Sequence, residues 1–234
     1  MKQMKLRETI IKHLLKEQDY IVGYADLRKL LAAKYAQYGY GIVIGRRMDS
    51  AIMDSIETGP NADYYALYQT VNVELAEIVK SIEAELRGNG IKAAGIAPSL
   101  TALDRNERFD HTLSLDFSHK LVATRAGLGW IGKSGLLITY EFGPRVRLVS
   151  VLVDYPVDYC RKPVLKSECQ DCDLCVQHCP ANALIGKEWT ITTRREEIFD
   201  VFACREKCRE LGGRIGKGIR LCGICISVCP FGKA

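Results

Sequence analysis

The chain has 234 residues, of which 47% are hydrophobic and 26% are charged, a balance typical of a globular protein with a full core. No run approaches the roughly 20 apolar residues that span a bilayer, and charged residues between positions 7 and 13 interrupt any apolar core of a signal peptide. These features exclude a membrane-spanning or secreted protein and predict a cytoplasmic one with no membrane partner.

Hydrophobic periodicity predicts that helices and strands alternate in the first part of the chain. Helices are predicted over residues 4–18, over 27–38, from Asn61 or Asp63 to Arg87, and from Ser118 through Arg125. Strands are predicted over residues 20–25, 40–45, 91–97, 135–139 and 146–153. Asp26 is placed to cap the second helix, and the polar stretch 99–117 is predicted to be a solvated loop. This alternation predicts a layered α/β or α+β fold without fixing the strand order.

The cysteines mark a second part of the chain. All ten lie at or after Cys160, which predicts a boundary between an α/β domain over residues 1–159 and a cysteine-rich domain over residues 160–234. Residues 169–179 read C-x2-C-x2-C-x3-C before a proline, and residues 222–229 read C-x2-C-x3-C before another. In two-cluster bacterial ferredoxins the cysteine before each proline ligates the neighbouring cluster. The spacing therefore predicts two [4Fe-4S] clusters.

Seven of the eight thiolate ligands follow from this spacing. The first set is Cys169, Cys172, Cys175 and Cys229, and the second set is Cys179, Cys222, Cys225 and one upstream cysteine. Cys204 is favoured for that eighth place because it follows an apolar run over residues 199–203. Cys208 stands among charged residues that indicate a solvated helical turn. It remains the alternative, since ferredoxin spacings do not decide between the two.

Zinc and disulfides explain the cysteines less well. A structural zinc ion usually takes two cysteine pairs that lie well apart in sequence, whereas four cysteines fall here within residues 169–179. A disulfide framework is typical of a short secreted chain. We therefore favour iron–sulfur clusters.

The segment 127–134 is rich in glycine. Gly127, Gly129 and Gly132 permit tight turns and close approach of the backbone to a bound group. The letters also match a phosphate loop, G-x4-G-K-S. Such a loop follows a strand, whereas a helix is predicted before Gly127, and Trp130 and Ile131 are too bulky for a phosphate cradle. A nucleotide site is therefore disfavoured.

The stretch RAGLGWIGKSGLLI (Arg125 to Ile138), followed by the two cysteine runs, resembles the epoxyqueuosine reductase family. Its members are cobalamin-dependent iron–sulfur enzymes related to reductive dehalogenases. The resemblance implies an α/β cobalamin-binding domain, a ferredoxin-like domain with two clusters, and Cys204 as the eighth ligand. Electrons would pass singly through the clusters to cobalt, which attacks or reduces the substrate. Residues expected to contact the cobalamin are Gly127, Gly129, Trp130, Ile131, Gly132 and Lys133.

The sequence also departs from that family. The family enzyme that acts on tRNA carries a C-terminal helical-repeat domain, whereas this chain ends at Ala234. We therefore expect a short form of the enzyme. Its substrate is expected to be either a small molecule or a tRNA nucleoside. The family's catalytic aspartate aligns with Leu113 here. Asp116 and His119, with His111 as a further alternative, are therefore the candidate proton donors.

Three functions remain open from the sequence. The first is a cobalamin-dependent reductase with an electron donor such as ferredoxin or flavodoxin. The second is a ferredoxin-type electron-transfer protein, or a reductive activator of a corrinoid protein, with no tRNA substrate. The third is an RNA-modifying enzyme whose basic stretch 205–220 meets phosphates. The net charge of +5 supports the third only weakly, because two clusters with about −2 each lower it to about +1.

Two arginines near the predicted strand 146–153 are further candidates. Arg145 and Arg147 alternate with apolar residues and so share one face of that strand. That face would meet the side chains of the corrin, an anionic substrate or simply water.

Overall fold

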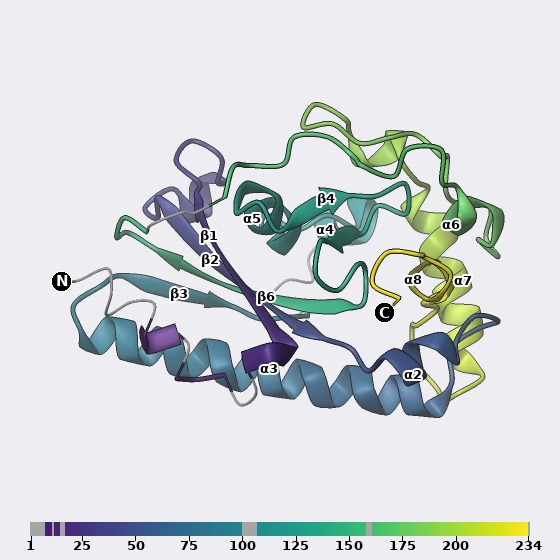
Figure 1. Ribbon diagram of the computed structural model, residues 1–234, viewed down its shortest axis with the longest axis horizontal. Helices are drawn as coiled ribbons and strands as arrows, with labels where there is room; N and C mark the ends of the chain where they lie inside the picture. Colours follow the sequence, from purple (N-terminus) through teal and green to yellow (C-terminus); the bar gives the residue numbers. More distant parts are fainter. Residues whose placement is uncertain (1–7, 11, 15–16, 100–106, 158–160, 234) are drawn as a thin grey trace. The chain divides into compact units, whose positions relative to one another are not determined.

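The computed structural model describes residues 8–10, 12–14, 17–99, 107–157 and 161–233 (Figure 1). The chain has a mixed α/β fold, as predicted, and forms two compact units, each assembled from separate segments. The sheet unit comprises residues 1–47, 71–128 and 147–164, and the cysteine unit comprises residues 48–70, 129–146 and 165–234. The units thus interleave along the sequence, and the single domain boundary after residue 159 stays a prediction.

A four-stranded sheet with the order β1-β2-β6-β3 lies at the centre of the sheet unit. Its strands are β1 (Tyr20–Asp26), β2 (Tyr40–Arg47), β3 (Ala93–Ile96) and β6 (Val146–Val153). β1 pairs antiparallel with β2, and β3 pairs antiparallel with β6. Burial is nearly continuous along the middle of β2 and the end of β6. Such a pattern indicates strands that are covered on both faces.

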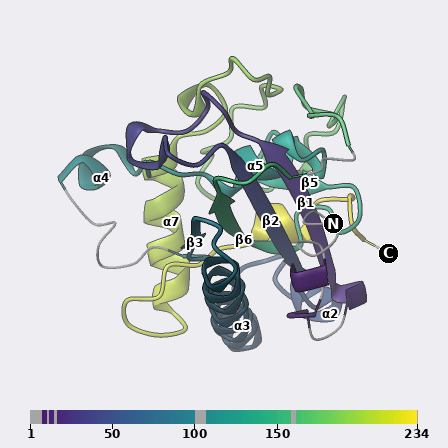
Figure 2. The same ribbon diagram turned by 90° about the vertical axis from the view of Figure 1, so that its left-hand side faces the viewer.

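Helices cover the two faces of this sheet (Figure 2). On one side α5 (His119–Arg125) and the residues after it approach β1 closely, since a Cβ at Gly23 would lie 2.6 Å from the Cβ of Ala126. On the other side α3 (Ala62–Gly88) reaches β3, where a Cβ at Gly95 would lie 3.3 Å from Val79 Cγ2. Asn61 caps α3 by accepting a 2.9 Å hydrogen bond from the Tyr64 amide, which decides between the two predicted starts.

The predicted helix over residues 27–38 is wrong. β1 and β2 are antiparallel neighbours, and the Leu27 amide donates to the Gly39 carbonyl, so both ends of the connection are held together. A helix of that length would separate those ends by about 16 Å. The connection instead turns at Lys29, whose φ is +66°, and contains only the 3-10 turn η2 (Ala33–Tyr35). The Asp26 carboxylate bonds Arg28 rather than a helix N-terminus.

Other boundaries differ less from the prediction. Most of the predicted helix 4–18 lies outside the described residues, and η1 (Glu17–Asp19) leads into β1. The short helix α4 (Glu107–Thr112) lies within the stretch predicted as a loop. Every helix in the described parts of the chain is too short or too polar to cross a membrane.

Short elements build the cysteine unit. Strands β4 (Gly129–Ile131) and β5 (Leu137–Thr139) form an antiparallel hairpin, of which only β5 was predicted. The helices are α2 (Ser50–Asp54), α6 (Leu174–Gln177), α7 (Val201–Gly213) and α8 (Ile224–Ser227), with the 3-10 turn η4 (Arg195–Glu197). α8 packs against both α6 and α2, and a small apolar core joins Leu211, Ile224 and Val228 to Cys175 and Cys222.

Candidate metal centre

Each cysteine run forms a tight turn that leads into a short helix. In the first run the Cys172 amide donates to the Cys169 carbonyl at 3.1 Å, and α6 then carries Cys175. In the second run Gly223 begins α8, which carries Cys225. Gly223 has a φ of +89°, and a Cβ there would lie 2.5 Å from Ile56, so this turn requires glycine.

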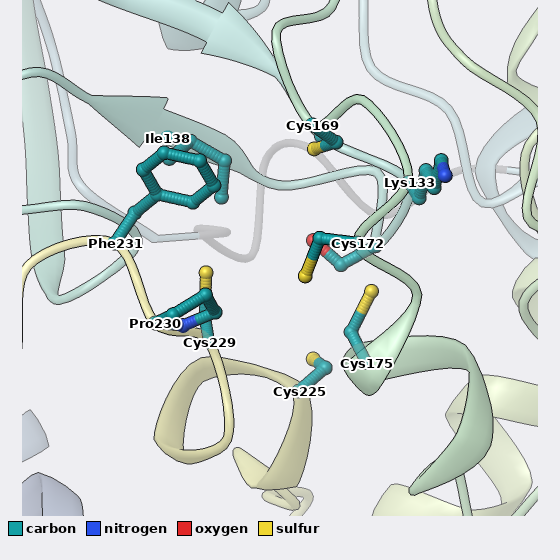
Figure 3. A pocket seen from close by; sticks show the side chains of 11 residues that line it. Lys133, Ile138, Cys169, Cys172, Cys175, Cys225, Cys229, Pro230 and Phe231 are labelled. Carbon is teal, nitrogen blue, oxygen red and sulfur yellow. The ribbon is translucent and has the colours of Figure 1, made fainter.

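The structure brings the four thiols of the first set together. Cys169, Cys172, Cys175 and Cys229 line one pocket, with their sulfur atoms directed toward a shared space (Figure 3). Cys225 contributes to the base of the same pocket, and Ile138 and Phe231 close one side of it. Cys229 lies 54 to 60 residues after the other three cysteines in the sequence, so the second run folds back on the first. We define Cys169, Cys172, Cys175 and Cys229 as the first thiol set.

The electrostatics of this set favour a bound cation. Burial, together with the negative charges of its three partners, raises the pKa of Cys175 to about 12. Burial and the charges of Cys169 and Cys172 likewise raise the pKa of Cys229 to about 11. Four thiols that oppose one another's ionisation gain most from a positive group that neutralises them all. Iron in a cluster supplies such charge.

The second set gathers around Cys225. Burial raises the pKa of Cys225, and the charges of Cys222, Cys204, Cys175 and Cys179 add to that effect. The Cys179 sulfur also accepts a hydrogen bond from the Ala183 amide at 3.4 Å. We define Cys179, Cys204, Cys222 and Cys225 as the second thiol set.

The prediction that Cys208 lies on a solvated face of its helix is wrong. Asp200 caps α7 by accepting from the Phe202 and Ala203 amides, and Cys204 and Cys208 then follow one turn apart on the same face. A hydrogen bond from Cys208 lowers the pKa of Cys204, and a second one lowers the pKa of Cys222 to about 7. The same two bonds raise the pKa of Cys208. Cys208 therefore lies within hydrogen-bonding reach of both thiols and can donate its single S–H to one of them at a time, while ligation by Cys204 stays a prediction.

The spacing of the side chains disfavours a single metal ion. Four thiolates at about 2.3 Å from one zinc ion lie about 3.8 Å from one another. Within the described residues, no three His, Cys, Asp or Glu side chains converge as the ligands of one ion would. All nine described cysteines are free of disulfides. A cubane, whose corners hold separate thiolates, takes an all-cysteine ligand set of the kind that lines this pocket.

The glycine-rich segment forms a wall of the first pocket. Trp130 donates its indole N–H to Cys169 Sγ at 3.4 Å, and a Cβ at Gly132 would lie 3.3 Å from the same sulfur. Lys133 is buried and donates to the Gln170 carbonyl at 2.7 Å. Ile131 is buried beside them in β4. The structure thus places these predicted cobalamin contacts next to thiols.

Two glycines of the segment serve close packing instead. A Cβ at Gly129 would lie 1.9 Å from the Ile138 carbonyl oxygen across the β4–β5 hairpin. A Cβ at Gly127, whose φ is +71°, would lie 2.6 Å from the Lys162 carbonyl oxygen. The helix α5 precedes Gly127, as expected, so the phosphate-loop interpretation fails on context.

The two candidate proton donors lie in the sheet unit, and each has a partner there. Asp116 pairs with Arg108. His119 contacts Ser150 Oγ at 2.9 Å through Nδ1 and the Ala97 carbonyl at 3.0 Å through Nε2. A carbonyl only accepts, so Nε2 carries the proton and Nδ1 accepts from the serine hydroxyl. Burial lowers the pKa of His119 to about 4. Both nitrogens of a neutral ring are thus occupied, and a catalytic role for either residue stays a prediction.

Sequence reasoning missed the role of Arg145. Its side chain is only 2% exposed, pairs with Asp54 at 2.5 Å and donates to the Ser227 carbonyl at 3.3 Å. Its Nε has no hydrogen-bond partner among the described residues, and its positive charge lowers the pKa of Cys229 while burial raises it. A buried cation thus lies near the first thiol set. The only signal in the sequence was its position before a strand.

Arg147 likewise has protein partners rather than a solvated side chain. It donates to Asn72 Oδ1 at 2.9 Å and to the Pro98 carbonyl at 3.0 Å, within the sheet unit. Arg145 precedes β6 and belongs to the cysteine unit. Both arginines thus meet protein groups, whereas the sequence left the corrin, an anionic substrate and water open as their partners.

Comparison with known proteins gives a consistent picture. The family described as a 4Fe-4S double cluster binding domain matches residues 168–232. The epoxyqueuosine reductase of Pseudomonas aeruginosa is 26% identical over 218 residues, which cover 92% of this chain and 49% of that protein. The chain spans about half or less of the length of the curated relatives that it matches.

Solved structures share the fold at low sequence identity. One match is a reductive dehalogenase whose structure is described as suggesting a mechanism for B12-dependent dehalogenation. It has a TM-score of 0.68 and 19% sequence identity, and the match covers 92% of this chain and 30% of that one. An epoxyqueuosine reductase with an epoxyqueuosine-modified tRNA stem loop matches with a TM-score of 0.63 at 16% identity, over 99% of this chain and 65% of that one.

Proposed function

Because the chain is a homologue of the epoxyqueuosine reductases and carries a 4Fe-4S double-cluster domain, we propose that it is an iron–sulfur oxidoreductase that handles electrons one at a time. The observation that carries this proposal is the pocket lined by Cys169, Cys172, Cys175, Cys225 and Cys229. One [4Fe-4S] cluster bound to each set accepts and releases a single electron.

The residues around each set have separate tasks in this proposal. Cys169, Cys172, Cys175 and Cys229 hold one cluster, with the hairpin residues Trp130 and Gly132 forming the wall beside Cys169. The other cluster is held by Cys179, Cys204, Cys222 and Cys225. Cys175 and Cys225 lie close enough for their charges to interact. The two sets are therefore near neighbours, as transfer of an electron between clusters requires.

We further propose that the chain binds a cobalamin, which would supply the reductive chemistry at the substrate when bound. The support comes from the relatives, one of which is described as B12-dependent. The predicted wall of this site does not fit a corrin well, because Gly132 faces Cys169 and Gly127 faces the Lys162 backbone. We therefore assign no corrin contact to these glycines.

The relatives indicate the class of substrate but not the individual compound. A small molecule or a tRNA nucleoside would be reduced, since one solved relative was crystallised with a modified tRNA stem loop. Ferredoxin or flavodoxin would supply electrons. A cytoplasmic location suits this chemistry, because the cytosol keeps thiols reduced.

Anaerobic purification tests the proposal. We expect about eight irons and eight acid-labile sulfides per chain, and a change in the corrin absorption spectrum when cobalamin is added. The Cys172→Ser and Cys222→Ser variants are each expected to retain about four irons. Colourless protein, or zinc in place of iron, would contradict the iron–sulfur assignment. An unchanged corrin spectrum with both clusters intact would contradict only the cobalamin step.

A second function, electron transfer without a corrin, is favoured by one observation. The glycine-rich segment packs against the first thiol set and the Lys162 backbone. A protein of this kind would reduce an acceptor protein, or reactivate a corrinoid protein, from its clusters alone. The test is electron transfer from the reduced protein to an added corrinoid protein in the absence of free cobalamin. Reduction of that acceptor without any bound corrin would establish this second function.

A further inference from the structure

Trp130 is buried beside a predicted cluster ligand. It lies in β4 opposite Ile138 of β5 and is only 2% exposed. Its indole N–H donates to Cys169 Sγ at 3.4 Å. The indole N–H donates a single hydrogen bond along the N–H axis, and here that bond points at a thiol of the first set.

Neighbouring aromatic rings hold the indole in place. The ring of Phe231 meets it edge to face, with centroids 5.0 Å apart and an interplanar angle of 86°. The ring of Tyr140 lies 5.4 Å away, and its hydroxyl donates to Glu168 Oε1 at 2.7 Å. Phe231 directly follows the last cysteine–proline pair, so the hairpin segment and the C-terminal part of the cysteine unit both contribute to this packing. The donor is therefore pre-oriented and shielded from water.

A fixed N–H donor acts differently on the two oxidation states of a cluster. Reduction adds one negative charge, part of which resides on the thiolate sulfurs. A hydrogen bond to a more negative acceptor is stronger, so the donor stabilises the reduced cluster more than the oxidised one. Hydrogen bonds to the sulfurs and limited solvent exposure are established means of setting cluster potentials.

We propose that Trp130 raises the reduction potential of the cluster held by the first thiol set by donating its indole N–H to the Cys169 thiolate. The proposal rests on the proposed function, which assigns Cys169 as a ligand. Trp130 is thus a positioning residue that acts through Cys169. The second set receives its N–H donation at Cys179 from the backbone of Ala183, which a change at Trp130 leaves intact.

The test is a redox titration of the Trp130→Phe variant, followed by electron paramagnetic resonance under anaerobic conditions. Phenylalanine keeps an aromatic ring and removes the N–H. We expect the potential of one cluster to fall by up to about 59 mV, a tenfold change in a one-electron equilibrium, while the other stays unchanged. The matched control is Trp189→Phe, the same change at the only other tryptophan. Equal potentials in both variants and the wild type, or equal shifts of both clusters, would overturn the proposal.

A second measurement needs no change at Trp130. Protein labelled with ¹⁵N in the indole ring, carrying Trp189→Phe, leaves Trp130 as the only labelled tryptophan. Electron–nuclear double resonance of the reduced protein is expected to show a ¹⁵N coupling to a cluster. Absence of that coupling in protein with a full iron content would reject the role of Trp130. Wild-type protein without iron would reject the proposed function instead.

Discussion

At the residue scale, His119 is a histidine whose surroundings favour the neutral ring. Its two nitrogens are engaged by Ser150 and the Ala97 carbonyl, and the positive charge of Arg147 adds to the effect of burial in lowering its pKa to about 4. The edges of this ring also meet Phe117 at a centroid distance of 5.3 Å. Protonation would place a second positive charge in a buried site next to Arg147.

This arrangement predicts an acid-dependent loss of stability. The folded pKa of about 4 lies below the unfolded value of 6.5, so the unfolded chain binds the proton first as the pH falls. Stability is therefore complete above pH 6.5 and declines toward pH 4, by about 2 kcal/mol at pH 5. Urea denaturation of wild type and His119→Gln between pH 7 and pH 5 measures the difference.

The control for this prediction is His111→Gln, which changes a histidine that is 77% exposed. We expect that variant to follow the wild-type pH dependence, whereas His119→Gln is less stable at pH 7 but less sensitive to acid. If His119→Gln lost stability with the wild-type slope, the ring would not be the titrating group.

The eighth cluster ligand is also decided by single residues. Hydrogen bonding with Cys208 lowers the pKa of Cys204 and of Cys222 and raises the pKa of Cys208, which favours the thiolate at the first two residues. Ligation requires the thiolate. Cys204→Ser is therefore expected to retain about four irons, whereas Cys208→Ser retains about eight. Iron and sulfide analysis of both proteins, purified in parallel, makes the measurement. The opposite pattern would move the ligand to Cys208.

Single-residue predictions from the sequence succeeded where the signal is local. The two cysteine runs could be found because their spacing alone carries the chemistry. The contacts of Trp130 with Cys169 and of Arg145 with Asp54 join residues that are far apart in sequence. No local pattern specifies such contacts, because folding of the intervening chain creates them. Cys208 was misplaced for a related reason, since charged neighbours do not show which way a helix faces.

At the element scale, the β4–β5 hairpin depends on Gly129. The two strands approach so closely there that a Cβ would lie 1.9 Å from the Ile138 carbonyl oxygen. This contact is with backbone, which cannot turn aside as a long side chain can. The hairpin carries Trp130 into the wall of the thiol pocket, so its geometry bears on the cluster site.

The Gly129→Ala variant is expected to lose about 2–4 kcal/mol of stability, because the added methyl group forces the strands apart. Thermal denaturation of the anaerobic protein measures this loss. The control is Gly213→Ala at the end of α7, where a Cβ meets nothing within 4 Å. Alanine there should leave the stability unchanged or raise it by up to about 1 kcal/mol. Similar stability of the two variants would show that the hairpin tolerates a wider separation.

Elements with a strong period were the ones that sequence could predict. The buried face of α3 recurs every three or four residues, and β1, β2 and β6 were found near their observed positions. β4 has only three residues and lies in a segment whose glycines suggested a loop. The segment 27–38 has helical periodicity, but the antiparallel pairing of β1 with β2 overrides it. In both cases the prediction missed a pairing between strands, β4 with β5 and β1 with β2.

At the scale of the whole molecule, the two units differ in how they are held together. The sheet unit has a continuous apolar interior, in which Ile42, Val43 and Ile44 are fully buried. In the cysteine unit most of the apolar core comes from residues 48–70 and 129–146, such as Met53, Ile56 and Trp130. Within its segment 165–233 the described buried apolar residues are only Ala183, Ile198, Leu211, Ile224, Val228 and Cys229. A segment of this size with so small a core usually depends on a metal or cross-links.

Removal of iron is therefore expected to unfold one unit selectively. Anaerobic treatment with an oxidant and a chelator should expose the amides of α6 and α8 to hydrogen exchange, because the bonds from the cluster to the cysteines of these helices are lost. The amides of β2 and β6 should stay protected, since their burial does not involve the cysteines. Mass spectrometry of peptic peptides resolves the two regions, and reconstitution with iron and sulfide should restore protection in α6 and α8. Equal loss of protection in β2 would show that the sheet also depends on the clusters. Unchanged protection in α6 would show that the apolar contacts around Leu211 are enough to keep the cysteine unit folded.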